Sequence, residues 1–152
     1  MNKSTKTKKN FILMGILFFL GLTVNAQTWK TDMNEAREQA QKEHKQILLV
    51  FQGSDWCAPC IKLDREIWTS SEFKDYAKEH YVLVKADFPR REKNQLEPEQ
   101  QEKNNKLAEK YNQQGYFPLV ILFDEEGHVL GKTGYKKLSP KEYIALLNSF
   151  KS

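Results

Sequence analysis

The sequence predicts a single α/β domain with a central mixed sheet of four to five strands flanked by helices. Its length, the alternation of its segments and one hairpin support this prediction. The chain of 152 residues suits one hydrophobic core rather than two. Its short apolar runs are separated by segments with helical periodicity, and strands connected in that way pair in parallel. The last two runs are joined by a short turn, which adds an antiparallel edge.

The first helix is predicted to open at Asp32, whose carboxylate can cap it, with Glu35 three positions later. We expect this helix to end near His44. The continuous apolar run at residues 47–51 follows, and a run of that length is typical of a fully buried central strand.

The second helix is predicted to begin at the two cysteines and to reach about Trp68. Within it, Cys60, Leu63 and Ile67 recur with helical spacing and share one face. We expect this face to lie on the sheet, beside the strand that precedes the helix.

A third helix, a strand and a polar segment follow. Ser70 can cap the helix. Residues 81–86 form a second apolar, β-branched run, which is typical of a buried strand. Residues 89–106 are rich in Arg, Lys, Glu, Gln and Asn, and we interpret them as a solvated insertion that merges into a helix over residues 98–111.

The C-terminal part is predicted to form a hairpin and a last helix. Residues 119–123 and 128–131 are predicted strands, joined by a turn in which Gly127 supplies a positive φ. Ser139 opens a capping box, with Pro140 at the first helical position. We find no internal repeat and no second domain.

The N-terminus has the pattern of a secretory signal peptide. Four lysines precede the apolar run at residues 11–24, and small residues end at Ala26, where signal peptidase would cut. An uncleaved membrane anchor is the alternative, but the run is shorter than the roughly 20 apolar residues that a spanning helix needs. We therefore expect a cleaved signal peptide over residues 1–26. The mature domain, residues 27–152, would then be periplasmic or secreted, where disulfides persist.

The charge of the mature domain argues against two classes of partner. The formal charge of +4 comes from the four N-terminal lysines, so residues 27–152 are formally neutral. A neutral domain offers no electrostatic basis for binding nucleic acid or an anionic membrane surface. We expect it to be a monomer.

The chain contains two cysteines, Cys57 and Cys60. A Cys-x-x-Cys pair is either a redox dithiol or half of a zinc site. Here it follows a buried strand and opens a helix, where free N–H groups and the helix dipole stabilise a thiolate. We therefore predict Cys57 as a partly exposed nucleophile and the inward-facing Cys60 as the resolving thiol. Pro59 stiffens the loop, and Trp56 would shield Cys57 and offer an apolar surface to a peptide.

The other interpretations of the pair are a zinc site and a structural disulfide. Zinc needs two more ligands, and the three histidines are dispersed along the chain at His44, His80 and His128. A disulfide that closes so small a loop gains little chain entropy. We therefore predict no bound metal, and metal handling by the two cysteines and one histidine is a weaker hypothesis.

Two motifs resemble those of the thioredoxin superfamily. Residues 56–60 read Trp-Cys-Ala-Pro-Cys, similar to the thioredoxin active-site motif with Ala in the place of its usual Gly. Residues 116–119 read Tyr-Phe-Pro-Leu, similar to the loop in which that family has a cis-proline entering a strand. Gly131 or Gly134 fits a third, weaker mark. The resemblance covers residues 30–150.

The resemblance implies a thioredoxin fold and a redox-active Cys57–Cys60 pair. It also implies that the Phe117–Pro118 peptide bond is cis and that Pro118 lies against the pair. The backbone of Phe117 would then be open to an extended substrate segment, so Trp56, Phe117 and Pro118 are the predicted substrate-binding residues.

One position departs from the family pattern. Thioredoxins usually carry a buried Asp in the strand before the first cysteine, where it assists proton transfer at the resolving thiol. This chain has Phe51 there, or Val50 if the loop is one residue longer. Asp64 and Asp87 are other carboxylates that could take this task.

Together these features favour a thiol-disulfide oxidoreductase that exchanges disulfides with exported protein substrates and contributes to redox homeostasis. The similarity to the thioredoxin motif favours reduction. The dithiol carries the electrons, so no organic cofactor is needed, and a reductase implies a membrane electron-transfer protein as its reducing partner. The alternative is a thioredoxin-fold binding or chaperone protein for exported proteins or metal-site assembly, suggested by residues 89–106 and Phe117.

Overall fold

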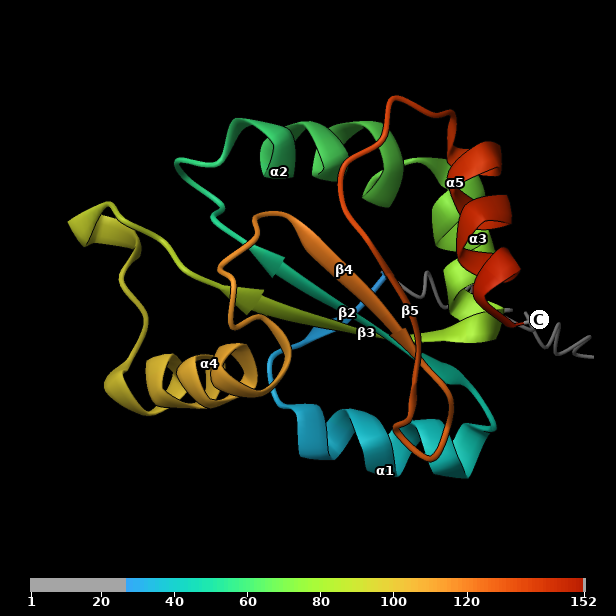
Figure 1. Ribbon diagram of the computed structural model, residues 1–152, viewed down its shortest axis with the longest axis horizontal. Coiled ribbons are helices and arrows are strands. Elements are labelled where there is room, and N and C mark those ends of the chain that lie inside the picture. Colours follow the sequence, from blue (N-terminus) through green and yellow to red (C-terminus); the bar gives the residue numbers. More distant parts are fainter. Residues whose placement is uncertain (1–26, 152) are drawn as a thin grey trace, which may run out of the picture.

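The computed structural model describes residues 27–151, and in this part of the chain five strands form one mixed sheet (Figure 1). The strands are β1 (Trp29–Lys30), β2 (Gln46–Gln52), β3 (Tyr81–Asp87), β4 (Leu119–Phe123) and β5 (Val129–Thr133). Their order is β1-β3-β2-β4-β5. β3 is parallel to both β1 and β2, whereas β4 is antiparallel to both β2 and β5. The predicted mixed sheet is confirmed, and the predicted signal peptide lies outside the described residues.

β2 lies at the centre of the sheet because its sequence is apolar on both faces. Leu48 and Val50 point into one hydrophobic cluster, and Ile47, Leu49 and Phe51 point into the other. A strand of this kind must be covered by helices on both sides, and Figure 1 shows helices above and below the sheet.

One face of the sheet is covered by the helical segment that follows Cys57 and by α3 and α5 (Figure 1). The elements are α2 (Ala58–Leu63), a π-helical turn η1 (Asp64–Trp68), α3 (Ser71–His80), α5 (Pro140–Asn148) and a 3₁₀ turn η3 (Ser149–Lys151). Trp68 lies at the centre of this layer and is 1% exposed. Its ring contacts those of Trp29, Phe73 and Tyr143, with centroids 5.9, 4.6 and 5.4 Å away.

The predicted caps and hairpin turn are confirmed. Ser70 and Ser139 accept backbone N–H groups at the starts of α3 and α5, and the second is part of a capping box. The hairpin between β4 and β5 turns at Gly127, whose φ is 90°. The strand predicted at residues 128–131 starts one residue later and extends to Thr133, because its pairing with β4 continues that far.

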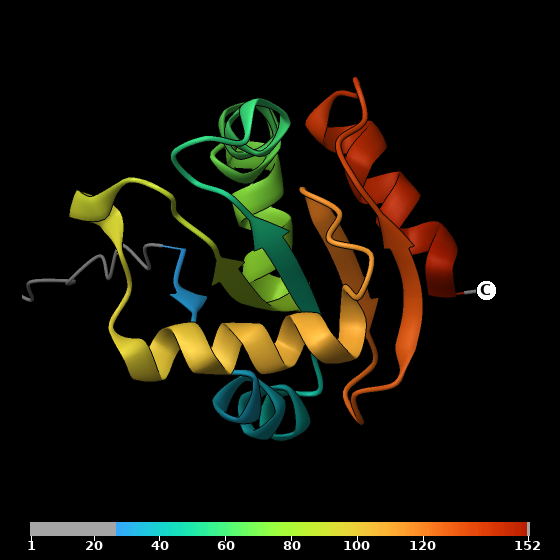
Figure 2. The same ribbon diagram turned by 60° about the vertical axis from the view of Figure 1, so that its left-hand side comes forward.

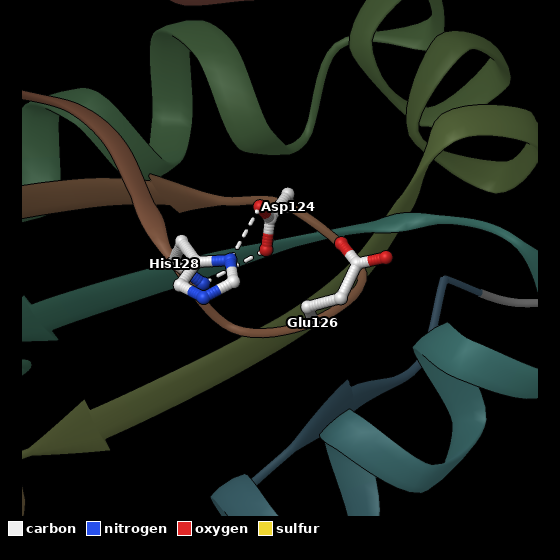
Figure 3. A group of neighbouring side chains, drawn as sticks. All are labelled: Asp124, Glu126 and His128. Carbon is white, nitrogen blue, oxygen red and sulfur yellow. Dashed lines mark hydrogen bonds and ion pairs between the residues drawn. The ribbon is translucent and has the colours of Figure 1, made fainter.

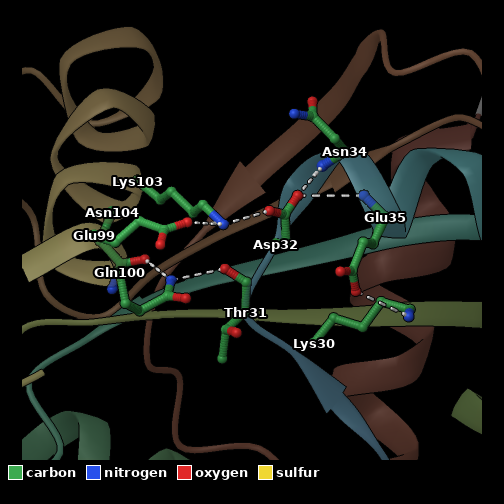
Figure 4. A network of polar contacts seen from close by, with 9 residues as sticks. All are labelled: Lys30, Thr31, Asp32, Asn34, Glu35, Glu99, Gln100, Lys103 and Asn104. Carbon is green, nitrogen blue, oxygen red and sulfur yellow. Dashed lines mark hydrogen bonds and ion pairs between the residues drawn. The ribbon is translucent and has the colours of Figure 1, made fainter. Parts of the chain in front are cut away.

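The opposite face of the sheet is covered by α1 (Met33–Glu43) and α4 (Pro98–Tyr111). α1 has the predicted ends, because Asp32 caps its first turn through two backbone N–H groups and His44 closes it with a φ of 53°. Polar contacts fix α4 to the start of α1 (Figure 4). Among these contacts are two ion pairs of Lys103, whose Nζ lies 3.1 Å from both Asp32 Oδ2 and Glu99 Oε1.

The polar segment after β3 is mostly exposed, as predicted, with one exception. Asn104 is 1% exposed, and its side-chain amide donates to the carbonyl oxygen of Asp87 at 2.8 Å. Gln100 donates in turn to Asn104 Oδ1 at 2.9 Å. A buried amide is stable here because its polar atoms have partners. Within residues 27–151 we find no helix with the length and apolar character needed to cross a bilayer.

Candidate active site

The two cysteines lie where the loop after β2 enters α2. Cys57 is the N-cap of this helix, and Cys60 lies in its first turn. Their sulfurs form a disulfide 2.09 Å long, and the Cys60 N–H donates to Cys57 Sγ at 3.3 Å. This is the placement expected from the sequence. In the reduced state the N–H groups and the dipole at the start of a helix favour a thiolate on the first cysteine.

The exposure predicted for Cys57 is wrong for the disulfide form. Both cysteines are 3% exposed. The sulfur of Cys57 is covered because it is bonded to the inward-facing Cys60 and also accepts the N–H of that residue. Two polar residues of the loop before Cys57 bond to the end of β3 and the segment after it: Ser54 donates to the Asp87 carboxylate, and Asp55 accepts from residues 90, 91 and 94.

Trp56 is held between its own loop and residues 88–95, which contain one 3₁₀ turn, η2 (Glu92–Asn94). Its Nε1 donates to the carbonyl oxygen of Phe88 at 2.7 Å. The guanidinium of Arg90 lies over the indole, with Cζ 3.7 Å from the ring centroid. Gly53 is necessary beside the indole, because any Cβ there would collide with the ring. Trp56 therefore offers a partner less surface than the sequence suggested.

Asp55 joins the two loops. Its Oδ1 accepts the N–H of Arg90 at 2.9 Å, and its Oδ2 accepts the N–H of Arg91 at 3.0 Å and Nδ2 of Asn94 at 2.9 Å. These bonds, led by the one from Arg90, lower the pKa of the Asp55 carboxyl below its ordinary value. Sequence reasoning missed this role, since the partners lie 35 to 39 positions further along the chain.

Replacing Asp55 with Asn should loosen residues 88–95, because the amide has one acceptor oxygen where the carboxylate has two. We expect faster hydrogen exchange at the amides of Arg90 and Arg91. Asp75→Asn, an exposed change of the same chemistry on α3, is the control.

The wild type should show the same loosening of residues 88–95 in acid. The pKa of Asp55 is lowered on folding, so the protection is complete above the ordinary Asp pKa of about 3.9 and is lost as pH falls through the lowered value. Unchanged protection in Asp55→Asn would contradict the assignment.

The second predicted motif lies beside Trp56. The Phe117–Pro118 peptide bond is cis, which confirms the prediction. The ring of Phe117 meets the indole of Trp56 edge-on, with centroids 5.4 Å apart. A Cβ at Gly134 would lie 3.0 Å from the carbonyl oxygen of Pro118, whereas Gly131 has no such neighbour in this loop. Of these two glycines, Gly134 is therefore the one that packs closely against the cis-proline loop.

A groove of about 720 Å³ opens beside these motifs. Pro59 of the cysteine motif and Phe117 and Pro118 of the cis-proline loop form part of its wall. The rest comes from the end of α4, the loop after it, and β5 with the residues that follow, including the rings of Tyr111, Tyr116 and Tyr135. Of the predicted substrate-binding residues, the structure thus brings Phe117 and Pro118 to the groove and places Trp56 against Phe117.

The carboxylate that thioredoxins carry below the dithiol has an apolar replacement. Val50 lies in the hydrophobic cluster that includes the segment after Cys57, whereas Phe51 faces the other layer. The matching position is therefore Val50. Asp64 forms an ion pair with Lys85 at 3.1 Å, and Asp87 accepts an N–H and a hydroxyl from the loop after β2. Both of these carboxylates have partners of their own.

A group of possible metal ligands lies at the hairpin between β4 and β5 and contains no cysteine (Figure 3). It consists of Asp124, Glu126 and His128, whose ligand atoms lie within 4.8 Å of one another. His128 Nδ1 lies 2.9 Å from Asp124 Oδ2, so a hydrogen bond accounts for their approach. Among residues 27–151, no such group combines a cysteine with a histidine.

Comparisons with known proteins agree with this geometry. A family described as Thioredoxin-like matches residues 28–125. The disulfide bond reductase DsbH of Chlamydia pneumoniae is 40% identical over 115 residues, which are 76% of this chain and 68% of that protein. The thioredoxin-related protein DsbJ of the same organism is 27% identical over 106 residues, 70% of this chain and 30% of that protein.

Comparison with solved structures also finds proteins with a thioredoxin-like fold. A structure of a DsbH oxidoreductase is 30% identical to this chain, with a TM-score of 0.75, and the match covers 99% of this chain and 94% of that one. A putative disulphide-isomerase from Bacteroides thetaiotaomicron is 22% identical, with a TM-score of 0.56 and coverage of 81% and 92%, and shares the fold.

Proposed function

The chain belongs to the thioredoxin-like family and is a thiol-disulfide oxidoreductase, and from that premise we propose that it reduces disulfide bonds in exported proteins. One observation carries the proposal. The Cys57–Cys60 disulfide lies at the start of α2, beside an open groove whose wall includes Pro59, Phe117 and Pro118. A dithiol beside such a groove can meet an extended peptide that contains a disulfide.

The reaction uses both sulfurs. In the reduced protein the Cys57 thiolate attacks one sulfur of a substrate disulfide and forms a mixed disulfide, and the other substrate sulfur leaves as a thiolate that takes up a proton. Cys60 then loses its proton and attacks the sulfur of Cys57. This step releases the second substrate sulfur and forms the Cys57–Cys60 disulfide. The two electrons of the dithiol end on the substrate, so neither an organic cofactor nor a metal takes part.

The substrate segment is held by the residues around the pair. The backbone of Phe117 would pair with an extended chain, as in strand addition. Pro118 lies in the groove wall, and the part of Trp56 that Arg90 leaves uncovered would contact the substrate near its sulfur.

The direction of the reaction implies partners and a location. The similarity to a protein named as a disulfide bond reductase supports reduction. A reductase is left oxidised after each cycle, so we infer a membrane electron-transfer protein that reduces it again. The signal-like pattern of residues 1–26 supports export to the periplasm or beyond. We expect the exported protein to act as a monomer.

The reduction potential of the Cys57–Cys60 pair tests this proposal. The purified protein would be equilibrated in dithiothreitol or glutathione buffers, and its thiols trapped and counted. We expect a value near the roughly −270 mV of thioredoxin, which suits a reductase. A value near the roughly −120 mV of strong periplasmic oxidants would overturn the direction and make the protein a disulfide donor.

A further inference from the structure

The groove beside the cysteines is lined by aromatic rings and positively charged side chains. Aromatic rings form part of its wall, from Tyr111, Tyr116, Phe117 and Tyr135. Lys110 and Lys132 also line it, and among the described residues no Asp or Glu does. Cations without nearby opposite charge in a partly apolar groove favour a partner that carries negative charge.

The two lysines come from different elements that meet at the groove. Lys110 lies in the last turn of α4, and Lys132 lies on β5; Figure 2 shows that end of the helix next to the sheet. Lys132 Nζ donates to the carbonyl oxygen of Tyr111 at 3.2 Å. Lys110 Nζ lies 5.1 Å from the centroid of the ring of Tyr111. Both ammonium groups therefore lie near Tyr111, one at its backbone carbonyl and the other at its ring.

Both charges are available to a bound molecule. The two lysines are exposed, and neither forms an ion pair with any carboxylate in residues 27–151. Two other lysines of α4 differ in this respect. Lys103 pairs with acidic side chains of its own helix and of the α1 cap, and Lys106 pairs with Glu102. The unpaired cations of α4 and β5 are thus found at the groove.

We propose that this groove binds an extended segment of the substrate protein that carries a carboxylate side chain close to its reactive cysteine. The inference rests on the proposed function, because the substrate sulfur must lie at Cys57 while its neighbours follow the groove. The aromatic rings receive apolar side chains of the segment, and Lys110 and Lys132 receive the carboxylate. Acidic surroundings therefore mark a preferred disulfide, and basic surroundings disfavour one.

Peptides that contain a disulfide test the proposal. Three peptides would share one sequence and carry Glu, Gln or Lys at the positions flanking the half-cystine. The measurement is kcat/KM for their reduction by the purified protein. We expect the Glu peptide to exceed the Gln peptide by about fivefold at low salt, the size of two solvent-screened ion pairs. The ratio should approach one in about 1 M NaCl, where the screening length is about 3 Å.

Charge-matched variants locate the effect. The ratio should fall partly in Lys110→Gln and in Lys132→Gln and disappear in the double variant. Lys141→Gln, an exposed change at the start of α5, should keep it. Equal kcat/KM for all three peptides, or a ratio unchanged by the groove variants, would overturn the charge preference while reduction itself still stands. Failure of the wild type to reduce any peptide, and insulin as well, would instead overturn the proposed function and the inference with it.

Discussion

Replacing Cys57 with serine should abolish the reduction of protein disulfides, a loss on the order of a thousandfold or more. A serine hydroxyl is not a useful nucleophile toward sulfur at neutral pH, so no mixed disulfide can form at this position. The substitution changes one atom, and the fold should be retained. The loss is measured by an insulin reduction assay with dithiothreitol as the electron donor. The turbidity of the precipitating insulin chains reports the rate.

Cys60→Ser is the matched control, because it changes the same atom one turn further into the helix. This variant keeps the attacking thiol and lacks the resolving one, so it should accumulate a covalent complex with the substrate. The complex would be visible on a non-reducing gel and would disappear with excess thiol. Insulin reduction that survives in Cys57→Ser would contradict the mechanism. Full biological function of an inactive Cys57→Ser variant would favour the binding or chaperone role considered from the sequence.

Replacing Trp68 with alanine should have the largest effect on stability, lowering the free energy of unfolding by about 3–5 kcal/mol. Trp68 is 1% exposed and contacts the rings of Trp29, Phe73 and Tyr143. Alanine would remove these contacts and leave a cavity that the surrounding helices can close only in part. Urea unfolding of the oxidised protein, followed by far-ultraviolet circular dichroism, measures the change.

Ile61→Ala is the control for this prediction. Ile61 lies on the same helical segment and is 46% exposed, so its removal should change the free energy of unfolding by less than about 0.5 kcal/mol. If Trp68→Ala cost less than about 1 kcal/mol, Trp68 could not be the centre of the layer above the sheet.

Much of the fold can be predicted from the sequence because its signals are local. The apolar run at residues 47–51 is short and continuous, which favours a strand buried on both faces, and the structure confirms it. Asp32, Ser70 and Ser139 mark helix starts by a chemistry that acts within a few residues. β1 was missed for the opposite reason. It has two residues, too few to show a period, and exists because β3 offers it a free edge.

Some features of the candidate site could also be predicted from local sequence, and others could not. Cys57, Cys60 and the cis-proline loop were found from short motifs, and the structure places Pro59 of the first motif and Pro118 of the second around one groove. The burial of Cys57 and the binding partners of Asp55 could not be found. Both features depend on which distant segments the fold brings together. The sequence periodicity predicts helices and strands, but it does not predict which donors Asp55 binds or how much of Cys57 is covered.

The contacts of Asp55 also limit how this active site can be transplanted. A designer who copied residues 56–60 into another protein would move the dithiol but leave behind the loop that orients Trp56. The copied segment would also lack Asp55, whose carboxylate accepts the N–H groups of Arg90 and Arg91, and Gly53, which leaves room for the indole. Residues 52–60 must therefore be moved together with residues 87–94, and also with the Phe117–Pro118 loop, whose Phe117 ring packs against Trp56.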